Sequence, residues 1–592
     1  MGSERLLLSY LRSKWYVYLL ALIAIAGGNV IHSQYPRLLG SFTDELQQGA
    51  LTKLTITGYS LKLLGVGVSY GLLVAAGQYL IMRAGRWFEY TARQRLFGQF
   101  TRLNSDFHTK HGVGRLLSYV MNDVTAVRES ISMGINHAIN STILILSAVV
   151  TMAFSSIPLP LIGVCILPLM LIPYFVIRFR RPVRERSLRV QETLGAMTES
   201  AEEQFGGIRV ARKFAVEEVM AQRFADTVDR IRESQLSLVR VSAFFQSLIP
   251  LLGSLSLVVT LAYGGYLTLQ GRITLGQFVA LTLYMRMMVN PLQQIGRVIN
   301  TMQRSRASLQ RIGELLQREP DIRDSADAAD ADLEGQPISV RNLSFTYPDS
   351  GEEVLRDVSV EIPPGRQIGI LGRTGSGKST LVKLLLRIYD PPEGAIHIGG
   401  TDLRELSLQS LRSQIAYVPQ EGFLFSTTIR DNIAFYRRES PIVEVEEAAG
   451  QAQIRSSIEA FADGYDTLFG ERGITLSCGQ RQRTSLARGL IKNAPVLILD
   501  DSVSAVDTVT EQRIIETVRT ERKGRTTILI AHRISAVRHA DEILVMDGGR
   551  IIERGTHAQL LWLGGWYARM HAIQEEGSPH VPHHFAEASE GV

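Results

Sequence analysis

The sequence predicts a multi-domain membrane protein, in which an all-α domain of six transmembrane helices is followed by an α/β P-loop NTPase domain. Three observations predict this class. The chain has 592 residues, more than a single hydrophobic core usually organises. Its first half contains long runs without Asp, Glu, Lys or Arg. Its second half contains a glycine-rich phosphate-binding pattern between an apolar strand and a helix with apolar periodicity.

Composition excludes several other classes. The only two cysteines, Cys165 and Cys478, exclude a disulfide framework and a cysteine-rich metal site. The net charge of +5 is modest for this length, and the arginines gather in loops between apolar segments, so we expect no nucleic-acid partner. The N-terminal apolar run continues too far for a cleavable signal peptide.

Six apolar segments are long enough to cross about 30 Å of hydrocarbon as helices. The predicted spans are residues 15–36, 63–82, 130–155, 158–177, 241–271 and 273–299. Pro158 and Pro160 predict a tight turn between the third span and the fourth. The sixth span contains one charged residue, Arg286.

The loops between these spans predict the orientation in the membrane. The loop after span two carries eight Lys and Arg residues and the loop after span four carries thirteen. The opposite loops carry three, none and one. Because basic loops stay inside, both termini are expected in the cytoplasm. Both basic loops keep helical apolar spacing, which predicts helices that extend into the cytoplasm and turn back near residues 112–115 and 204–207.

Polar residues at membrane depth suggest a substrate cavity. Arg286 is the strongest candidate, because a charge near the middle of the membrane usually faces water or protein and marks a pathway. Other polar residues within the spans are Asn29, His32, Gln78, His137 and Gln246, of which Asn29, His32 and Gln246 are taken as candidate lining. Hydrogen bonding between helices, or snorkelling, is the alternative for each of them.

In two stretches the apolar residues show neither helical nor strand periodicity. Residues 317–336 are acidic and rich in small residues, which predicts an exposed linker between a membrane domain at 1–316 and a nucleotide-binding domain at 337–575. The chain is polar again from Gln574 onward, and residues 576–592 are predicted to be a disordered tail.

The P-loop follows an apolar strand at residues 368–371. Its glycines let backbone N–H groups curl around phosphates, and the helix that follows adds a favourable dipole. Lys378 would contact the β- and γ-phosphates and the Ser379 hydroxyl would ligate Mg²⁺. The predicted phosphate-binding residues are Gly372, Arg373, Thr374, Gly375, Ser376, Gly377, Lys378, Ser379 and Thr380.

A second apolar strand, VLIL, ends in two adjacent acids, Asp500 and Asp501. Side chains alternate along a strand, so the two carboxylates cannot perform the same task. We expect Asp500 to hold Mg²⁺ through water and Asp501 to act as the general base that orients the attacking water.

Further motifs occur in an order that resembles the ABC transporter superfamily, in particular exporter-type (type IV) half-transporters such as bacterial multidrug and lipid exporters. The motifs are LSFTYP, AYVPQEGFLF, FGERGI, ITLSCGQRQRTSLARGL, SAVD and LIAHRIS, besides the P-loop and LILDD. The resemblance spans about residues 10–575.

This resemblance implies roles for single residues. Tyr347 would stack on adenine, Gln420 would sense the γ-phosphate and Mg²⁺, and His532 would hold the γ-phosphate and the attacking water. Further residues would act on the ATP bound by a second half-transporter, since the family sandwiches two nucleotides between two domains; these are Ser477, Cys478, Gly479, Gln480 and Asp507.

The resemblance also implies ATP and Mg²⁺ as cofactors, a bacterial inner-membrane location, and export of an amphipathic or hydrophobic small molecule, lipid or peptide. Alternatives left open are an importer built on the exporter plan, as for siderophores, and an ATP-gated channel or sensor subunit.

Two positions depart from the family pattern. Asp501 stands where the family has Glu, and its side chain is one methylene shorter. Cys478 replaces the first glycine of the LSGGQ signature. These departures favour one subunit of a heterodimer with unequal ATP sites and slow hydrolysis by this chain alone, while a homodimer remains the alternative.

Overall fold

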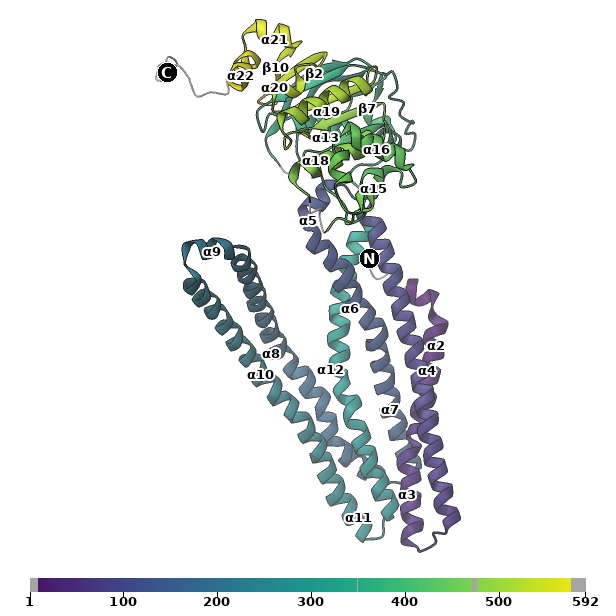
Figure 1. The fold of residues 1–592 in the computed structure, drawn as a ribbon. Helices are drawn as coiled ribbons and strands as arrows, with labels where there is room; N and C mark the ends of the chain where they lie inside the picture. The colour runs from purple at the N-terminus through teal and green to yellow at the C-terminus, as the bar shows by residue number, and fades with distance from the viewer. Residues whose placement is uncertain (1–8, 349, 471–475, 576–592) are drawn as a thin grey trace. The chain divides into compact units, whose positions relative to one another are not determined.

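The computed structural model describes residues 9–348, 350–470 and 476–575. The chain separates between Glu319 and Pro320 into two compact units. The first unit is helical throughout its described residues, and the second contains two β-sheets (Figure 1). This arrangement confirms the predicted class, a helical membrane domain followed by an α/β domain.

The helices of the first unit are long because backbone polar groups in hydrocarbon must be paired within their own segment. They are α2 (Trp15–His32), α3 (Gln34–Gln47), α4 (Lys53–Phe100), α5 (Ser105–Ser118), α6 (Val124–Glu129), α7 (Ile135–Phe154), α8 (Leu159–Gly206), α9 (Ile208–Phe214), α10 (Glu217–Val259), α11 (Gly265–Leu269) and α12 (Leu275–Gln317). Short π-helical segments occur at Tyr119–Asp123, Ser130–Gly134 and Thr260–Gly264.

Five helical runs among the described residues are long and apolar enough to cross a membrane. They are Trp15–Gln47, Lys53–Phe100, Ser105–Phe154, Leu159–Phe179 and Glu217–Leu269. The sixth predicted span falls in α12, which is not among these five. Gln277, Arg286 and Asn290 make this part of α12 more polar than the other runs.

The helices pack in sets (Figure 1). Helix α8 packs along α10, α2 packs along α4, and α12 packs against α3 and α7. Gly40 and Gly276 allow the close crossing of α3 and α12, since a Cβ at Gly276 would lie 2.0 Å from the Gly40 carbonyl oxygen. Tyr284 of α12 is fully buried and donates a hydrogen bond of 2.8 Å to the Ser33 carbonyl oxygen.

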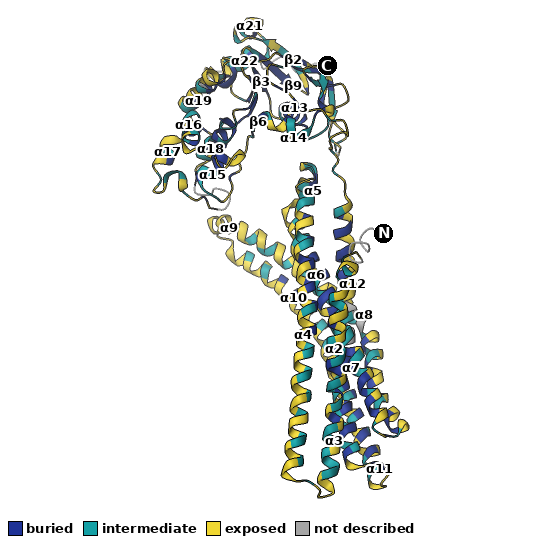
Figure 2. Cartoon of the chain, turned by 90° about the vertical axis from the view of Figure 1, so that its right-hand side faces the viewer, coloured by how far each residue is buried: buried dark blue, intermediate teal, exposed yellow. Residues whose placement is uncertain are grey.

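The predicted turns in the two basic loops correspond to local breaks in the helices. Gly112 has φ 65° and ψ 155° and kinks α5. Gly207 separates α8 from α9, and α9 leads into α10. Exposed side chains cover much of α9, among them Val210 and Phe214 (Figure 2).

The second unit is built on a six-stranded sheet with strand order β10-β9-β3-β8-β7-β6 and a four-stranded sheet with order β2-β1-β4-β5. Strands β9, β3, β8, β7 and β6 are parallel neighbours, and β10 is an antiparallel edge. All five residues of β7 are buried, as expected for a parallel strand covered on both faces.

The strands are β1 (Ile338–Thr346), β2 (Glu353–Ile362), β3 (Gln367–Gly372), β4 (Ile396–Ile398), β5 (Thr401–Asp402), β6 (Ile415–Val418), β7 (Val496–Asp500), β8 (Thr526–Ala531), β9 (Glu542–Asp547) and β10 (Arg550–Gly555). The helices are α13 (Lys378–Leu385), α14 (Leu408–Ser413), α15 (Ile429–Ile433), α16 (Ile442–Gln451), α17 (Arg455–Glu459), α18 (Cys478–Leu490), α19 (Thr508–Glu521), α20 (Ile534–Val537), α21 (His557–Leu563) and α22 (Trp566–Glu575).

Most residues of the stretch predicted to be an exposed linker, 317–336, are exposed in the structure, but residues 320–336 belong to the second unit. Ala331 and Leu333 are buried. The Ala329 N–H donates to the Glu405 carbonyl oxygen at 2.9 Å, and the Ser407 N–H donates to the Ala329 carbonyl oxygen at 2.8 Å. The acidic composition gave no sign that two apolar side chains are buried, or that Ala329 pairs with the distant backbone near Leu406.

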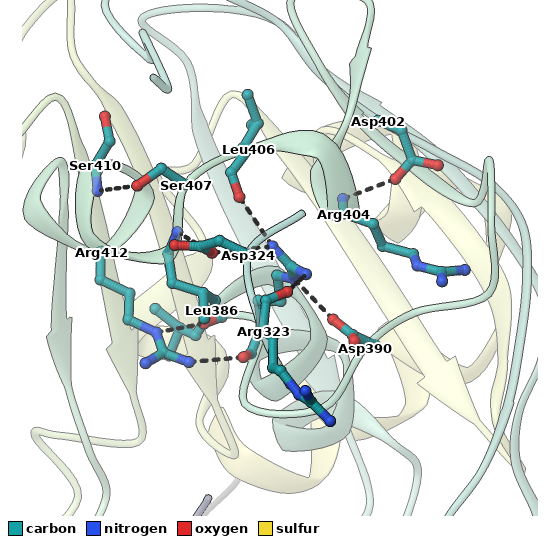
Figure 3. Close-up of polar contacts among 12 residues, drawn as sticks. Arg323, Asp324, Leu386, Asp390, Asp402, Arg404, Leu406, Ser407, Ser410 and Arg412 are labelled. Carbon is teal, nitrogen blue, oxygen red and sulfur yellow. Dashed lines mark hydrogen bonds and ion pairs between the residues drawn. The ribbon is translucent and has the colours of Figure 1, made fainter. Parts of the chain in front are cut away.

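Figure 3 shows the polar contacts around Arg323, Asp390 and Leu406. These three residues are partners of buried Arg387, which also holds this segment. Its guanidinium donates to a carboxylate oxygen of Asp390 at 2.7 Å and to the carbonyl oxygens of Leu406 at 2.8 Å and Arg323 at 2.9 Å. Arg412 donates to the Arg387 carbonyl oxygen at 2.7 Å. The backbone at Arg323 is therefore attached to the second unit, although the Arg323 and Asp324 side chains are exposed.

Candidate nucleotide-binding site

The predicted catalytic residues lie together at one edge of the six-stranded sheet. Strand β8 lies between β3 and β7, with Ala531 opposite Leu371 and Ile530 opposite Asp500. Because these strands are parallel, the P-loop, His532 and the paired acids all follow the same ends of neighbouring strands. Gln420 comes two residues after β6, at the same edge. Ligands of parallel α/β sheets bind at this end of the strands.

The geometry of the P-loop fits a phosphate chain. A Cβ at Gly372 would lie 2.2 Å from the Met546 carbonyl oxygen, and a Cβ at Gly377 would lie 2.6 Å from Leu355 Cδ2. Gly375 has φ 84° and faces open space, since no atom lies within 4 Å of the place that a Cβ would take there. The first-turn N–H groups of α13 have no partner within the helix, so they can bind an anion.

Lys378 is held inside this loop. Its side chain is buried, and Nζ donates to the carbonyl oxygens of Gly372 and Arg373 at 2.8 Å each. Burial lowers the pKa of Lys378, while the carboxylates of Asp500 and Asp501 act in the opposite direction. The ammonium group therefore lies where phosphate oxygens would be wrapped by the loop, while Arg373 and Thr374 stay exposed at its tip.

Ser379 and Asp500 form the candidate magnesium site. Ser379 Oγ donates to Asp500 Oδ1 at 3.2 Å. Neighbouring oxygens on an octahedral Mg²⁺ ion lie about 3 Å apart, so a hydroxyl and a carboxylate at this separation fit the ion. Among the residues that the structure describes, no group of three or more His, Cys, Asp or Glu could hold a metal ion.

Tyr417, which was not predicted, contacts the other oxygen of the same carboxylate. Its hydroxyl donates to Asp500 Oδ2 at 3.3 Å. Burial raises the pKa of Asp500, and the hydroxyls of Ser379 and Tyr417 act in the opposite direction. A signal was available, because Tyr417 lies opposite Ile498, two residues before Asp500 on the same face of the sheet.

We expect Tyr417→Phe to weaken magnesium binding. Loss of one hydrogen bond to a charged group should raise the Mg²⁺ concentration for half-maximal ATP hydrolysis by about tenfold to a hundredfold. The variant removes a contact that lowers the pKa of Asp500, so activity should also fail at a higher pH when the solution is acidified. Titration of Mg²⁺ at several pH values measures both effects.

The control is Tyr436→Phe, since Tyr436 is an exposed tyrosine in the same unit. An unchanged Mg²⁺ requirement in Tyr417→Phe would show that the hydroxyl does not support Asp500.

The two adjacent acids at the end of β7, Asp500 and Asp501, contact different residues. Asp501 is nearly buried, but its φ of 47° lies in the left-handed region, so its side chain leaves the alternation of the strand. Its N–H donates to the Ile530 carbonyl oxygen at 2.9 Å. Asp501 Oδ2 accepts a hydrogen bond of 3.2 Å from Gln420 Nε2. Asp500 therefore faces Ser379 whereas Asp501 faces Gln420.

Gln482 is a second residue that the sequence did not single out. Its buried side chain donates to the Gln420 carbonyl oxygen at 3.2 Å and accepts from the Ala505 N–H at 2.9 Å. It thus connects the Gln420 loop, helix α18 and the loop that precedes α19.

His532 and Tyr347 are the residues predicted to contact the γ-phosphate and the adenine ring. His532 is half-buried, and its ring makes no hydrogen bond to any residue that the structure describes. The Tyr347 hydroxyl lies 2.9 Å from Thr380 Oγ1, with Lys383 Nζ 5.8 Å from the ring centre, which places this aromatic ring beside the P-loop helix.

The signature residues begin helix α18. Ser477 caps it by accepting from the Gln480 N–H at 3.2 Å, and Gln480 Oε1 accepts from the Ser477 N–H at 3.0 Å. Cys478 is exposed at the first position of the helix. A Cβ at Gly479 would lie 3.0 Å from the Ala505 carbonyl oxygen, so this glycine is needed for close packing.

Asp507 caps α19 by accepting from the Thr510 N–H at 3.0 Å, and this contact lowers the pKa of its carboxyl. Most of the FGERGI motif, from residue 471 onward, lies outside the described residues.

The four candidate cavity residues are not joined to one another by a hydrogen bond among the described residues. Asn29 is buried, and its Nδ2 donates to Asn140 Oδ1 at 2.9 Å, so it links α2 to α7. His32 stacks on Tyr70, with ring centres 4.2 Å apart. Arg286 and Gln246 are exposed.

Two family models match the chain, one in each unit. Residues 18–292 match the family model described as the ABC transporter transmembrane region, and residues 355–504 match the model described as ABC transporter.

Two relatives are similar over nearly the whole chain. The "Probable multidrug resistance ABC transporter ATP-binding/permease protein YheI" of Bacillus subtilis is 35% identical over 572 residues, which cover 96% of each protein. An ATP-dependent lipid A-core flippase of Aromatoleum aromaticum is 36% identical over 589 residues, which cover 97% of this chain and 96% of the relative.

A solved structure of a bacterial Atm1-family ABC exporter with ATP bound is also similar. Its TM-score is 0.79 at 27% sequence identity, and the match covers 95% of this chain and 98% of that one.

Proposed function

This chain belongs to the ABC transporter family, and on that premise we propose that it hydrolyses ATP to export an amphipathic or hydrophobic small molecule, lipid or peptide. The observation that carries the proposal is the shared strand edge, where the P-loop, Asp500, Asp501 and His532 follow neighbouring parallel strands. A unit with five membrane-length helical runs precedes that edge in the same chain.

Each residue at this edge would have a separate role in ATP hydrolysis. The P-loop N–H groups and Lys378 would bind the β- and γ-phosphates. Ser379 and Asp500 would hold Mg²⁺, which when bound neutralises charge on the phosphate oxygens. Asp501 would orient and deprotonate the attacking water, and His532 would hold that water against the γ-phosphate.

A second half-transporter would complete the site. The exposure of Ser477 and Cys478 at the start of α18 supports an action on a nucleotide held by the partner. ATP would then bridge two domains, and its hydrolysis would remove the contacts that favour the closed state. We propose a heterodimer, because Asp501 alters this chain's own site while Cys478 would alter the partner's.

The proposed location is the bacterial inner membrane, with both termini and the ATP site in the cytoplasm. The distribution of Lys and Arg among the loops supports this orientation. The multidrug and lipid names of the bacterial relatives support an amphipathic cargo.

Arg286 is proposed to contact that cargo. It lies on the face of α12 that the rest of the chain leaves exposed, one helical turn from exposed Asn290. A charge at membrane depth costs about 2.5–3.5 kcal/mol on insertion scales, so this face requires a water-filled cavity or a protein partner rather than lipid.

We expect Arg286→Ala to weaken the response to anionic cargo. In reconstituted vesicles, the concentration of short-chain phosphatidylglycerol that half-maximally stimulates ATP hydrolysis should rise about tenfold, because a charge-assisted contact is lost. Neutral short-chain phosphatidylcholine should show a smaller change. Arg272→Ala, at an exposed arginine just before α12, is the control. Equal stimulation of both variants and the unmodified protein by both lipids would give Arg286 a structural role only.

A further inference from the structure

We propose that Gln574, near the end of helix α22, is a positioning residue for the histidine loop, residues 532–535. The inference rests on the proposed function, because it assigns to this loop the histidine that contacts the γ-phosphate. The polar composition predicted that the chain loses its periodicity at Gln574, but α22 continues to Glu575. The end of the last described helix is thus connected to the catalytic edge.

The side-chain amide of Gln574 contacts the loop on both sides of Arg533. Gln574 Oε1 accepts a hydrogen bond of 2.8 Å from the Ile534 N–H. Gln574 Nε2 donates a hydrogen bond of 3.1 Å to the His532 carbonyl oxygen. A primary amide can make this pair of contacts because it carries one acceptor and one donor in a single plane. The backbone that carries the His532 ring is therefore fixed by one side chain.

Helix α22 is itself held firmly, so the position of Gln574 is determined by the fold. The carboxylate of Glu553 on β10 accepts from the N–H groups of Trp566 and Tyr567 at the first turn of α22. Tyr567 is fully buried, and its hydroxyl lies 2.7 Å from His557 Nδ1. The anchor lies two turns before Gln574, on the same helix.

The opposite side of the histidine loop is fixed by helix α19. The Glu511 carboxylate is buried and accepts from Arg533 Nη1 at 2.8 Å and from Ser535 Oγ at 2.6 Å. The contacts to Glu511 hold the side chains of the loop, whereas those to Gln574 hold its backbone. The residues after β8 are therefore clamped between α19 and α22, with the His532 ring left free among the described residues to meet a ligand.

Loss of the Gln574 amide should misplace His532 without affecting the P-loop. We expect Gln574→Ala to lower kcat for ATP hydrolysis about three- to tenfold while KM for ATP stays within about twofold, since catalysis depends more steeply on placement than binding does. The full-length protein in vesicles, with its partner if one copurifies, is the material for this assay.

Hydrogen exchange gives a readout that is independent of turnover. The Ile534 N–H begins helix α20, where no helical carbonyl can accept from it. Its exchange should therefore become faster in Gln574→Ala. The matched control is Glu575→Gln, the next residue of α22, whose carboxylate lies 3.3 Å from His571 Nε2 and contacts no residue of the histidine loop by a hydrogen bond or ion pair among the described residues. In this control, the Ile534 N–H should keep its protection from exchange, and kcat for ATP hydrolysis should stay unchanged.

A second variant separates the two contacts. Gln574→Glu has the same length and can still accept from the Ile534 N–H, but its carboxylate cannot donate to the His532 carbonyl oxygen. It should keep the exchange protection of Ile534 and yet lose activity to the same extent as Gln574→Ala. Because Gln574→Glu keeps the side-chain length and one of the two contacts, it also tests the inference if the alanine variant fails to fold.

Unchanged kcat in both Gln574 variants, or an equal loss in Glu575→Gln, would overturn the inference. An unmodified protein that binds ATP without hydrolysing it would instead overturn the proposed function, and this inference with it. The two failures are therefore distinguishable by the rate of the unmodified protein.

Discussion

Replacing Lys378 with alanine is expected to reduce ATP hydrolysis by at least about 100-fold and to stop cargo movement, because the preorganised cation of the P-loop is lost. The structure holds Nζ on two carbonyl oxygens of the loop, 2.8 Å from each, so the charge occupies its place before a nucleotide arrives. ATP hydrolysis and ATP-dependent uptake into inside-out vesicles are the measurements.

The control for this experiment is Lys523→Ala, at an exposed lysine of the same unit. It should retain both activities. Transport that continues undiminished in Lys378→Ala would show that nucleotide bound at this P-loop does not drive the membrane unit.

The family and the fold class could be predicted from the sequence, and the comparisons confirm both. The reason is physical. The P-loop pattern is contiguous in sequence, from Gly372 to Ser379, so it can be recognised without knowledge of the distant residues that pack against its glycines. Uncharged runs of membrane length are also contiguous in sequence, and five of the six predicted spans correspond to apolar helical runs among the described residues.

Residues that act through contacts distant in sequence were not predicted. Tyr417 reaches Asp500 across 83 positions of the chain, and Gln574 reaches His532 across 42. The attachment of residues 320–336 to the second unit was not predicted for the same reason, since their partners include Arg387 and the backbone of Glu405 and Ser407. Such pairings depend on which distant segments the fold brings together, which composition does not encode.

The membrane candidates illustrate the same limit. A polar residue within a span can contact another helix or face a cavity, and the sequence does not distinguish these cases. Asn29 bonds to Asn140 on a neighbouring helix, whereas Arg286 is exposed at a similar kind of position. The two cases differ in whether a neighbouring helix supplies a hydrogen-bond partner, and the residue type does not reveal this.

Lengthening the second acid of the pair is the other change with a large expected effect. Asp501→Glu should raise kcat for ATP hydrolysis by this chain about tenfold, because reactive groups displaced by about 1 Å lose up to about 10²-fold in rate. Asp501 now reaches only to Gln420 Nε2, at 3.2 Å, and its backbone is fixed by the contact to Ile530. One further methylene would carry the carboxylate toward the position of the attacking water.

Asp501→Asn is the matched variant, since it keeps the length and the contact with Gln420 but cannot take a proton. If Asp501 acts as a base, kcat for ATP hydrolysis by Asp501→Asn should be at least about tenfold lower than that of the unmodified chain. The two variants together test the heterodimer, because a shortened base makes this chain's own site the slow one. If the unmodified chain hydrolyses ATP rapidly by itself and gains nothing from Asp501→Glu, then the shorter acid is sufficient here, and a homodimer with two active sites is the better description.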